Sequence, residues 1–96
     1  MENAELKIQK IIEELKNYNP KNIILFGSRA RGDFRQNSDI DIVVDLDLNF
    51  RDKRKLREKI DFIAGLYSVD LIFLNEVDKS FRDKILNEGK NLYEKK

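Results

Sequence analysis

The 96-residue sequence contains no cysteine and no histidine, and it has a single proline. Without cysteine the chain forms no disulfide bond and offers no thiol nucleophile. Without histidine as well, it lacks an imidazole base and the usual ligands of zinc. Any chemistry must therefore use carboxylates, hydroxyls, cationic side chains and a hard metal ion that prefers oxygen ligands.

Long apolar runs and a charge imbalance are also missing. No stretch reaches the roughly 18 apolar residues of a membrane-spanning helix, and residues 1–10 lack the apolar core of a signal peptide. Lysine plus arginine (19) nearly cancel aspartate plus glutamate (18), for a net charge of +1. No strong overall field favours nucleic acid or membranes. We therefore expect a cytoplasmic protein that binds neither directly.

The chain is 41% hydrophobic, which is enough for one core, so we expect a single domain over residues 1–96. Apolar residues at helical spacing, short apolar runs, and glycine, proline and capping residues define the elements. Helices are predicted over Ala4–Asn17, Arg51–Leu66 and Phe81–Glu88, with a helical turn at Ser28–Arg31. Asp78 or Ser80 is expected to cap the last helix, and Gly89 to end it. Strands are predicted over Ile23–Phe26, Ile40–Leu46 and Val69–Leu74, with a short edge strand at Leu92-Tyr93. This order predicts an α/β (α+β) fold, in which helices pack against a small mixed sheet.

Gly27 and Ser28 form a turn between the first predicted strand and the helical turn that follows. A glycine there lets backbone N–H groups approach a phosphate closely, and a helix start favours negative charge. The Ser28 hydroxyl could donate to a phosphate oxygen. The alternative is an ordinary tight turn with a serine cap.

Asp39 and Asp41 flank Ile40 at the start of an apolar strand, although aspartate is a poor strand former. Residues two apart on a strand point to the same face, so the two carboxylates repel each other unless a cation lies between them. Together with the glycine-serine turn they indicate a magnesium-nucleotide site; otherwise they are solvent-facing aspartates. Asp45 and Asp47 share this alternation, but Asp45 lies about 13 Å beyond Asp41. We interpret Asp45 and Asp47 as strand-end and turn residues.

Asp70 is the candidate third carboxylate. It lies near the start of a buried strand that could run beside the strand of Asp41. There it could ligate a metal ion or take the proton from an acceptor hydroxyl. The alternative is a solvated aspartate at a strand start.

Arginines surround the glycine-serine turn. Arg29, Arg31 and Arg35 could clamp a triphosphate or stabilise a pyrophosphate leaving group, although solubility explains surface arginines equally well. Arg31 is favoured because it lies closest to Gly32 within the motif. The basic run over residues 51–59 is interpreted as a solvated helix face, or else as a docking face for an acidic partner.

Gly27-Ser28, ten intervening residues and Asp39-x-Asp41 match the signature of the DNA polymerase beta-like nucleotidyltransferase superfamily. The run from Gly27 to Gly32, Ser38-Asp39-Ile40-Asp41 and the ending over residues 85–94 most resemble the minimal nucleotidyltransferases. The resemblance implies the polymerase beta-like nucleotidyltransferase fold. It also implies that Asp39 and Asp41 hold the magnesium ions that bind a nucleoside triphosphate. Asp70 fits the strand that carries the third carboxylate of the family.

In such proteins an acceptor hydroxyl attacks the α-phosphorus and pyrophosphate leaves, with two metal ions assisting. By resemblance, minimal members are antitoxins that transfer AMP from ATP to a tyrosine of a HEPN ribonuclease toxin. The resemblance thus implies Mg2+ as cofactor, ATP as substrate, and a hetero-oligomer with a HEPN-type toxin. The implied site residues are Asp39, Asp41 and Asp70 for catalysis and metal binding, and Gly27, Ser28 and Arg31 for nucleotide binding.

Two alternative functions stay open. The chain could be a non-catalytic antitoxin that neutralises its partner by covering it. It could also be a small-molecule nucleotidyltransferase of the antibiotic-modifying kind, which would need an acceptor pocket.

Overall fold

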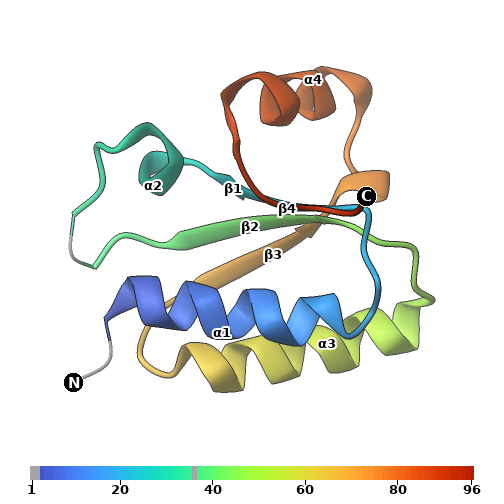
Figure 1. The fold of residues 1–96 in the computed structure, drawn as a ribbon, viewed down its shortest axis with the longest axis horizontal. Helices are drawn as coiled ribbons and strands as arrows, with labels where there is room; N and C mark the ends of the chain where they lie inside the picture. Colours follow the sequence, from blue (N-terminus) through green and yellow to red (C-terminus); the bar gives the residue numbers. More distant parts are fainter. Residues whose placement is uncertain (1–2, 36) are drawn as a thin grey trace.

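A computed structural model describes residues 3–35 and 37–96 of the chain. Within these residues helices and strands alternate, as the sequence predicts (Figure 1). The helices are α1 (Ala4–Lys16), α2 (Ser28–Arg31), α3 (Phe50–Ala64) and α4 (Lys79–Glu88), with a 3-10 turn, η1, over Leu74–Glu76. The strands are β1 (Asn22–Phe26), β2 (Ile40–Asp45), β3 (Val69–Phe73) and β4 (Lys90–Glu94). No helix among the described residues is long and apolar enough to cross a membrane.

The strands form one mixed sheet in the order β3-β2-β1-β4. Strand β1 is antiparallel to both β2 and β4, whereas β2 and β3 are parallel. The parallel pair follows from α3, because parallel neighbours need a long crossover connection. The mixed sheet with packed helices confirms the predicted α/β (α+β) class, and β4 confirms the predicted edge strand.

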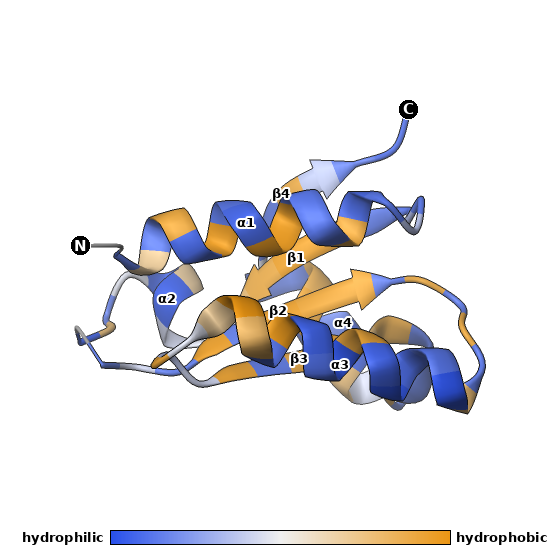
Figure 2. Cartoon of the chain, turned by 90° about the horizontal axis from the view of Figure 1, so that it is seen from below, coloured by the Kyte–Doolittle hydropathy of each residue, from blue (hydrophilic) through white to orange (hydrophobic). Residues whose placement is uncertain are grey.

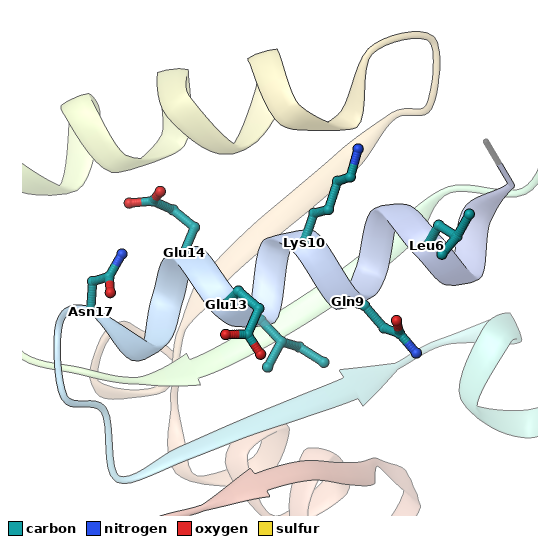
Figure 3. Close-up of a pocket in the computed structure, with 7 residues that line it drawn as sticks. Leu6, Gln9, Lys10, Glu13, Glu14 and Asn17 are labelled. Carbon is teal, nitrogen blue, oxygen red and sulfur yellow. The ribbon is translucent and has the colours of Figure 1, made fainter. Parts of the chain in front are cut away.

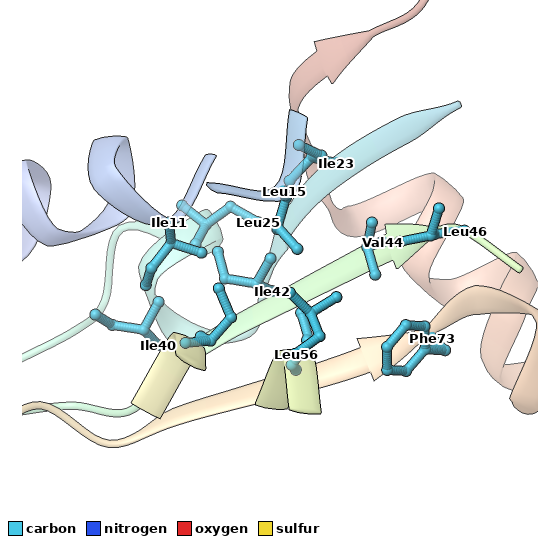
Figure 4. Close-up of a cluster of buried hydrophobic side chains, with 12 residues drawn as sticks. Ile11, Leu15, Ile23, Leu25, Ile40, Ile42, Val44, Leu46, Leu56 and Phe73 are labelled. Carbon is cyan, nitrogen blue, oxygen red and sulfur yellow. The ribbon is translucent and has the colours of Figure 1, made fainter. Parts of the chain in front are cut away.

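The main core lies between the sheet and the layer formed by α1 and α3 (Figure 1). In β2 the alternate residues Ile40, Ile42 and Val44 are fully buried in this core (Figure 4). Figure 2 shows apolar residues interspersed with polar ones along α1 and α3, and of these Ile11, Leu15, Leu56 and Ile60 are buried in this core. Since side chains alternate along a strand, Asp41 and Val43 of β2 must face the opposite side.

That opposite side of the sheet is covered by α4. Its core is smaller and joins Ile24, Val43 and Ile85, with Phe26, Ile72 and Phe81 packed at the margin. The helix begins at Lys79, and its cap is Asp78, one of the two predicted candidates. The Oδ1 atom of Asp78 accepts a hydrogen bond from the Phe81 N–H at 2.8 Å. Helix α4 does not cover this face completely, since Asp41 is only half-buried and Asp70 is exposed.

Gly89 ends α4, as the sequence predicts, but its backbone is extended and needs no glycine (φ −75°, ψ 157°). Glycine is required instead by the limited space around residue 89. A Cβ at residue 89 would overlap the Ile24 side chain and lie 2.6 Å from the Ile85 carbonyl oxygen. Glycine at this position therefore allows the end of α4 to lie directly against β1.

The observed bounds of several elements differ from the predicted ones by one or two residues: α3 ends at Ala64 instead of Leu66, and α4 begins at Lys79 instead of Phe81. Two other differences have a visible structural cause. The strand predicted over Val69–Leu74 ends at Phe73, because the chain turns into η1 there. The basic run over residues 51–59 is not simply a solvated face, since Lys53 is only 8% exposed. Its ammonium lies 3.3 Å from the Glu76 carboxylate and 4.9 Å from the centre of the Phe73 ring. Lys53 thus helps to fix η1 against α3.

Candidate functional site

Asp41 and Asp70 lie at facing positions on the parallel strands β2 and β3. Both point to the face of the sheet that α4 partly covers, because Ile40, Ile42 and Leu71 point into the core on the other face. The half-buried Asp41 and the exposed Asp70 therefore stand side by side. The structure brings together these two carboxylates, which are 29 positions apart in the sequence (70 − 41).

Asp39 immediately precedes β2 and is exposed. Its charge still reaches Asp41: burial, then the negative charges of Asp70 and Asp39, raise the pKa of the Asp41 carboxyl above its usual value. The positive charge of Arg31 acts in the opposite direction. A carboxylate whose ionised form is disfavoured in this way is one that a cation would stabilise.

Gly27 links β1 to α2 and lies against the Asp41 carboxylate. Its backbone (φ 77°, ψ −154°) falls in a region that is essentially open only to glycine. A Cβ at residue 27 would overlap Asp41 Oδ2. Gly27 is therefore required twice, once for the backbone turn and once for the space that the carboxylate occupies.

Ser28, the first residue of α2, is half-buried beside this turn. Arg31, the last residue of α2, is exposed, and its Nε lies 3.4 Å from Asp33 Oδ2. Arg31 is thus an accessible cation whose field reaches Asp41. Arg29 was also a candidate for the phosphate clamp. In the structure, however, its guanidinium donates two hydrogen bonds to the Ser38 carbonyl oxygen.

The donor set around Asp41 suits magnesium, which takes only oxygen ligands in proteins. Among residues 3–35 and 37–96, no three Asp or Glu side chains are arranged so that they could hold an ion by themselves. Magnesium usually binds through one or two carboxylates and completes its shell with substrate phosphates and water. Asp41 with its neighbours fits that pattern, whereas it would not fit a metal that needs a complete protein cage.

Phe26 also lies beside the carboxylates, although the sequence did not predict it as a site residue. Phe26 of β1 lies directly opposite Asp41 and packs edge-on against Phe81 of α4, with ring centres 5.6 Å apart. The two rings form an apolar wall on the side of Asp41 away from Asp70. The alternation from Ile24 to Phe26 was the available signal, but only the antiparallel register places Phe26 at this point.

Two surface hollows lie away from the carboxylates. The larger, about 750 Å3, is lined by side chains of α1 and its cap, as Figure 3 shows. A second hollow of about 570 Å3 lies between α1, β4 and the α2 region, and Leu25, Phe34 and Leu92 contribute to its lining. The first hollow runs along one helix and has no opposing wall, and neither hollow includes the three aspartates. The candidate site is therefore the sheet face that carries Asp41 and Asp70.

Comparison with known proteins gives a consistent result. The family model described as "Polymerase beta, Nucleotidyltransferase" matches residues 9–96. The chain is 34% identical over 99 aligned residues to the "Putative protein adenylyltransferase MJ0604" of Methanocaldococcus jannaschii, covering 95% of this chain and 99% of that protein.

Solved structures show the same relationship. A toxin-antitoxin crystal structure with AMP-PNP contains a chain with a TM-score of 0.73 and 32% identity, covering 97% of this chain and 75% of that one. A structure of a tri-AMPylated Shewanella oneidensis HEPN toxin with its MNT antitoxin gives a TM-score of 0.71 and 29% identity. That alignment covers 95% of this chain and 72% of the other.

Proposed function

Since the match over residues 9–96 makes this chain a member of the polymerase beta nucleotidyltransferase family, we propose that it transfers AMP from ATP to a partner protein. The acceptor is a hydroxyl, in our proposal the tyrosine hydroxyl of a HEPN-type ribonuclease toxin. The chain then acts as the antitoxin in a hetero-oligomer with that toxin. The relative named as a protein adenylyltransferase and the AMPylated toxin complex support this choice of reaction and partner.

The observation that carries the proposal is the pairing of Asp41 and Asp70 beside the Gly27 turn. In our assignment Asp39, Asp41 and Asp70 would hold magnesium together with the substrate phosphates, and the metal would neutralise the charge that develops on those phosphates. Gly27 and Ser28 receive the phosphates along the turn.

The remaining steps use groups of this chain. The acceptor oxygen forms a bond to the α-phosphorus while the bond from that phosphorus to the oxygen bridging to the β-phosphate breaks. The hydroxyl proton passes to the Asp70 carboxylate, which is exposed and can receive it. Pyrophosphate leaves with the negative charge, and in our assignment the exposed Arg31 attracts the leaving group.

The test compares the wild type with Asp39→Asn/Asp41→Asn, each incubated with magnesium, ATP and the toxin or host lysate. Parallel reactions carry label on the α- or the γ-phosphate. We expect a protein band labelled only from the α-phosphate and only by the wild type. Asp45→Asn is the matched control, because it changes a carboxylate on the same face of the same strand, four residues further along.

The alternatives make different predictions when the same two proteins are also assayed for toxin neutralisation and incubated with an aminoglycoside. If the double variant still neutralises the toxin while neither protein labels it, the chain is a binding-only antitoxin. If the label appears on an aminoglycoside instead of a protein, the chain modifies small molecules. In either case the proposed protein adenylyl transfer is wrong.

A further inference from the structure

Arg29 connects the phosphate turn to the segment that carries the first aspartate. It follows Ser28 in α2, and its Nε and Nη2 donate hydrogen bonds of 3.2 and 2.9 Å to the carbonyl oxygen of Ser38. Ser38 immediately precedes Asp39. A single side chain therefore bridges the two halves of the nucleotidyltransferase motif.

The Arg29 guanidinium is itself held in place. It lies over the Phe34 ring at 4.8 Å and over the Tyr67 ring at 5.8 Å from the ring centres. Such cation–π contacts orient a guanidinium more firmly than solvent does. Phe34 precedes Asp39 in the chain, whereas Tyr67 lies in the connection between α3 and β3, so Arg29 is positioned from two separate segments.

The residues on both sides of Asp39 are fixed in the structure. On one side the Ser38 carbonyl accepts from Arg29, and the Ser38 hydroxyl accepts a hydrogen bond of 2.8 Å from the Arg35 N–H. On the other side the Ile40 N–H donates to the Ser68 carbonyl oxygen at 2.9 Å. Asp39 lies outside the strand and is exposed, so its place depends on these neighbours.

We propose that Arg29 is a positioning residue, which sets where the Asp39 carboxylate stands relative to the Gly27–Ser28 turn. It acts through the Ser38 carbonyl and not by contact with the nucleotide. This inference rests on the proposed function, because it assigns Asp39 to the magnesium site. Groups that orient metal ligands typically contribute 10- to 100-fold to metal affinity or activity.

The test uses Arg29→Met, which removes the donors, and Arg29→Lys, which keeps a cation but not the two-donor fork. Arg54→Met is the control, an exposed arginine on α3. The first readout needs no acceptor: the Mg2+ concentration that gives half of the rise in Tm at saturating ATP. The second is kcat and KM for ATP in transfer to the toxin.

We expect Arg29→Met to raise the Mg2+ midpoint about 10-fold and to lower kcat more than it raises KM. Arg29→Lys should restore part of both, and Arg54→Met should match the wild type. If Arg29→Met does not fold, Arg29→Lys carries the test, with a smaller rise expected.

Three results would overturn the inference. The first is a lower Tm without ligand and an unchanged Mg2+ midpoint, which would make Arg29 purely structural. The second is a higher KM for ATP with an unchanged midpoint, which would make it a phosphate contact. The third is a wild type whose Tm does not respond to magnesium. If the wild type responds but labels no toxin, the proposed function fails while the midpoints still decide the role of Arg29.

Discussion

Replacing Gly27 with alanine should separate the two demands that the structure places on this residue. The backbone there (φ 77°, ψ −154°) costs a residue with a side chain on the order of 1–3 kcal/mol. The new Cβ would also overlap Asp41 Oδ2. To regain ordinary van der Waals contact, the carboxylate oxygen must move by about 1 Å.

A displacement of that size at a reacting centre lowers the rate by roughly 10²-fold, which corresponds to about 2.7 kcal/mol of transition-state stabilisation. We therefore expect Gly27→Ala to lose about two orders of magnitude in kcat for AMP transfer at saturating magnesium and ATP. Its Tm should fall as well, because each kcal/mol lost lowers the Tm of a domain of this size by roughly 4–8 °C.

Gly32 provides the matched control. It also has a positive φ (87°), but a Cβ added there meets nothing within 4 Å. Gly32→Ala should therefore lower the Tm through backbone strain of about 1–2 kcal/mol and leave kcat close to that of the wild type. Equal kcat values for the two alanine variants would refute the reasoning, and so would a Gly27→Ala structure in which Asp41 has not moved.

Three further substitutions test other parts of the structure. Burial and the charge of Asp70 raise the pKa of Asp41, so the ligand-free protein should lose stability as pH rises from the ordinary carboxyl pKa to the raised one. Asp41→Asn should accordingly have a higher Tm than the wild type at neutral pH. It should have no advantage below about pH 3, where the Asp41 carboxyl of the wild type is protonated in both the folded and the unfolded protein. A lower Tm of the variant at neutral pH would contradict this. Gly89→Ala should destabilise by about 1–3 kcal/mol through overpacking against Ile24, and an unchanged denaturation midpoint would show that α4 can move away freely. Asp78→Ala should cost about 1 kcal/mol through loss of the helix cap, measured by urea denaturation; no change would mean that another group replaces the cap.

Much of the fold was accessible from the sequence because the signals were local. Alternation along β2 placed Ile40 and Ile42 inside and Asp41 on the other face. The residues that end or cap helices, such as Asp78 and Gly89, also lie next to the elements they control. The reason for Gly89 was not accessible, because the contact that demands glycine comes from Ile24, far away in the chain.

The candidate site shows the same division. The spacing of Gly27, Asp39 and Asp41 is visible in the sequence itself. The prediction that Asp70 lies on the strand beside Asp41 agrees with the observed register. The sequence favoured Arg31 over Arg29 only because Arg31 lies closest to Gly32, and it did not predict a separate role for Arg29. What separates them is the Ser38 carbonyl, which only the folded loop places within reach of Arg29.

The parallel pairing of β2 with β3 also has a consequence for how the protein is made. Asp41 meets Asp70 only after α3 has been synthesised and has crossed the sheet to return the chain in the same direction. Such non-local pairing is slow compared with the formation of local contacts. A nascent chain that ends before β3 therefore carries Asp39 and Asp41 without the partner strand, and the two carboxylates gain their neighbour when β3 pairs with β2.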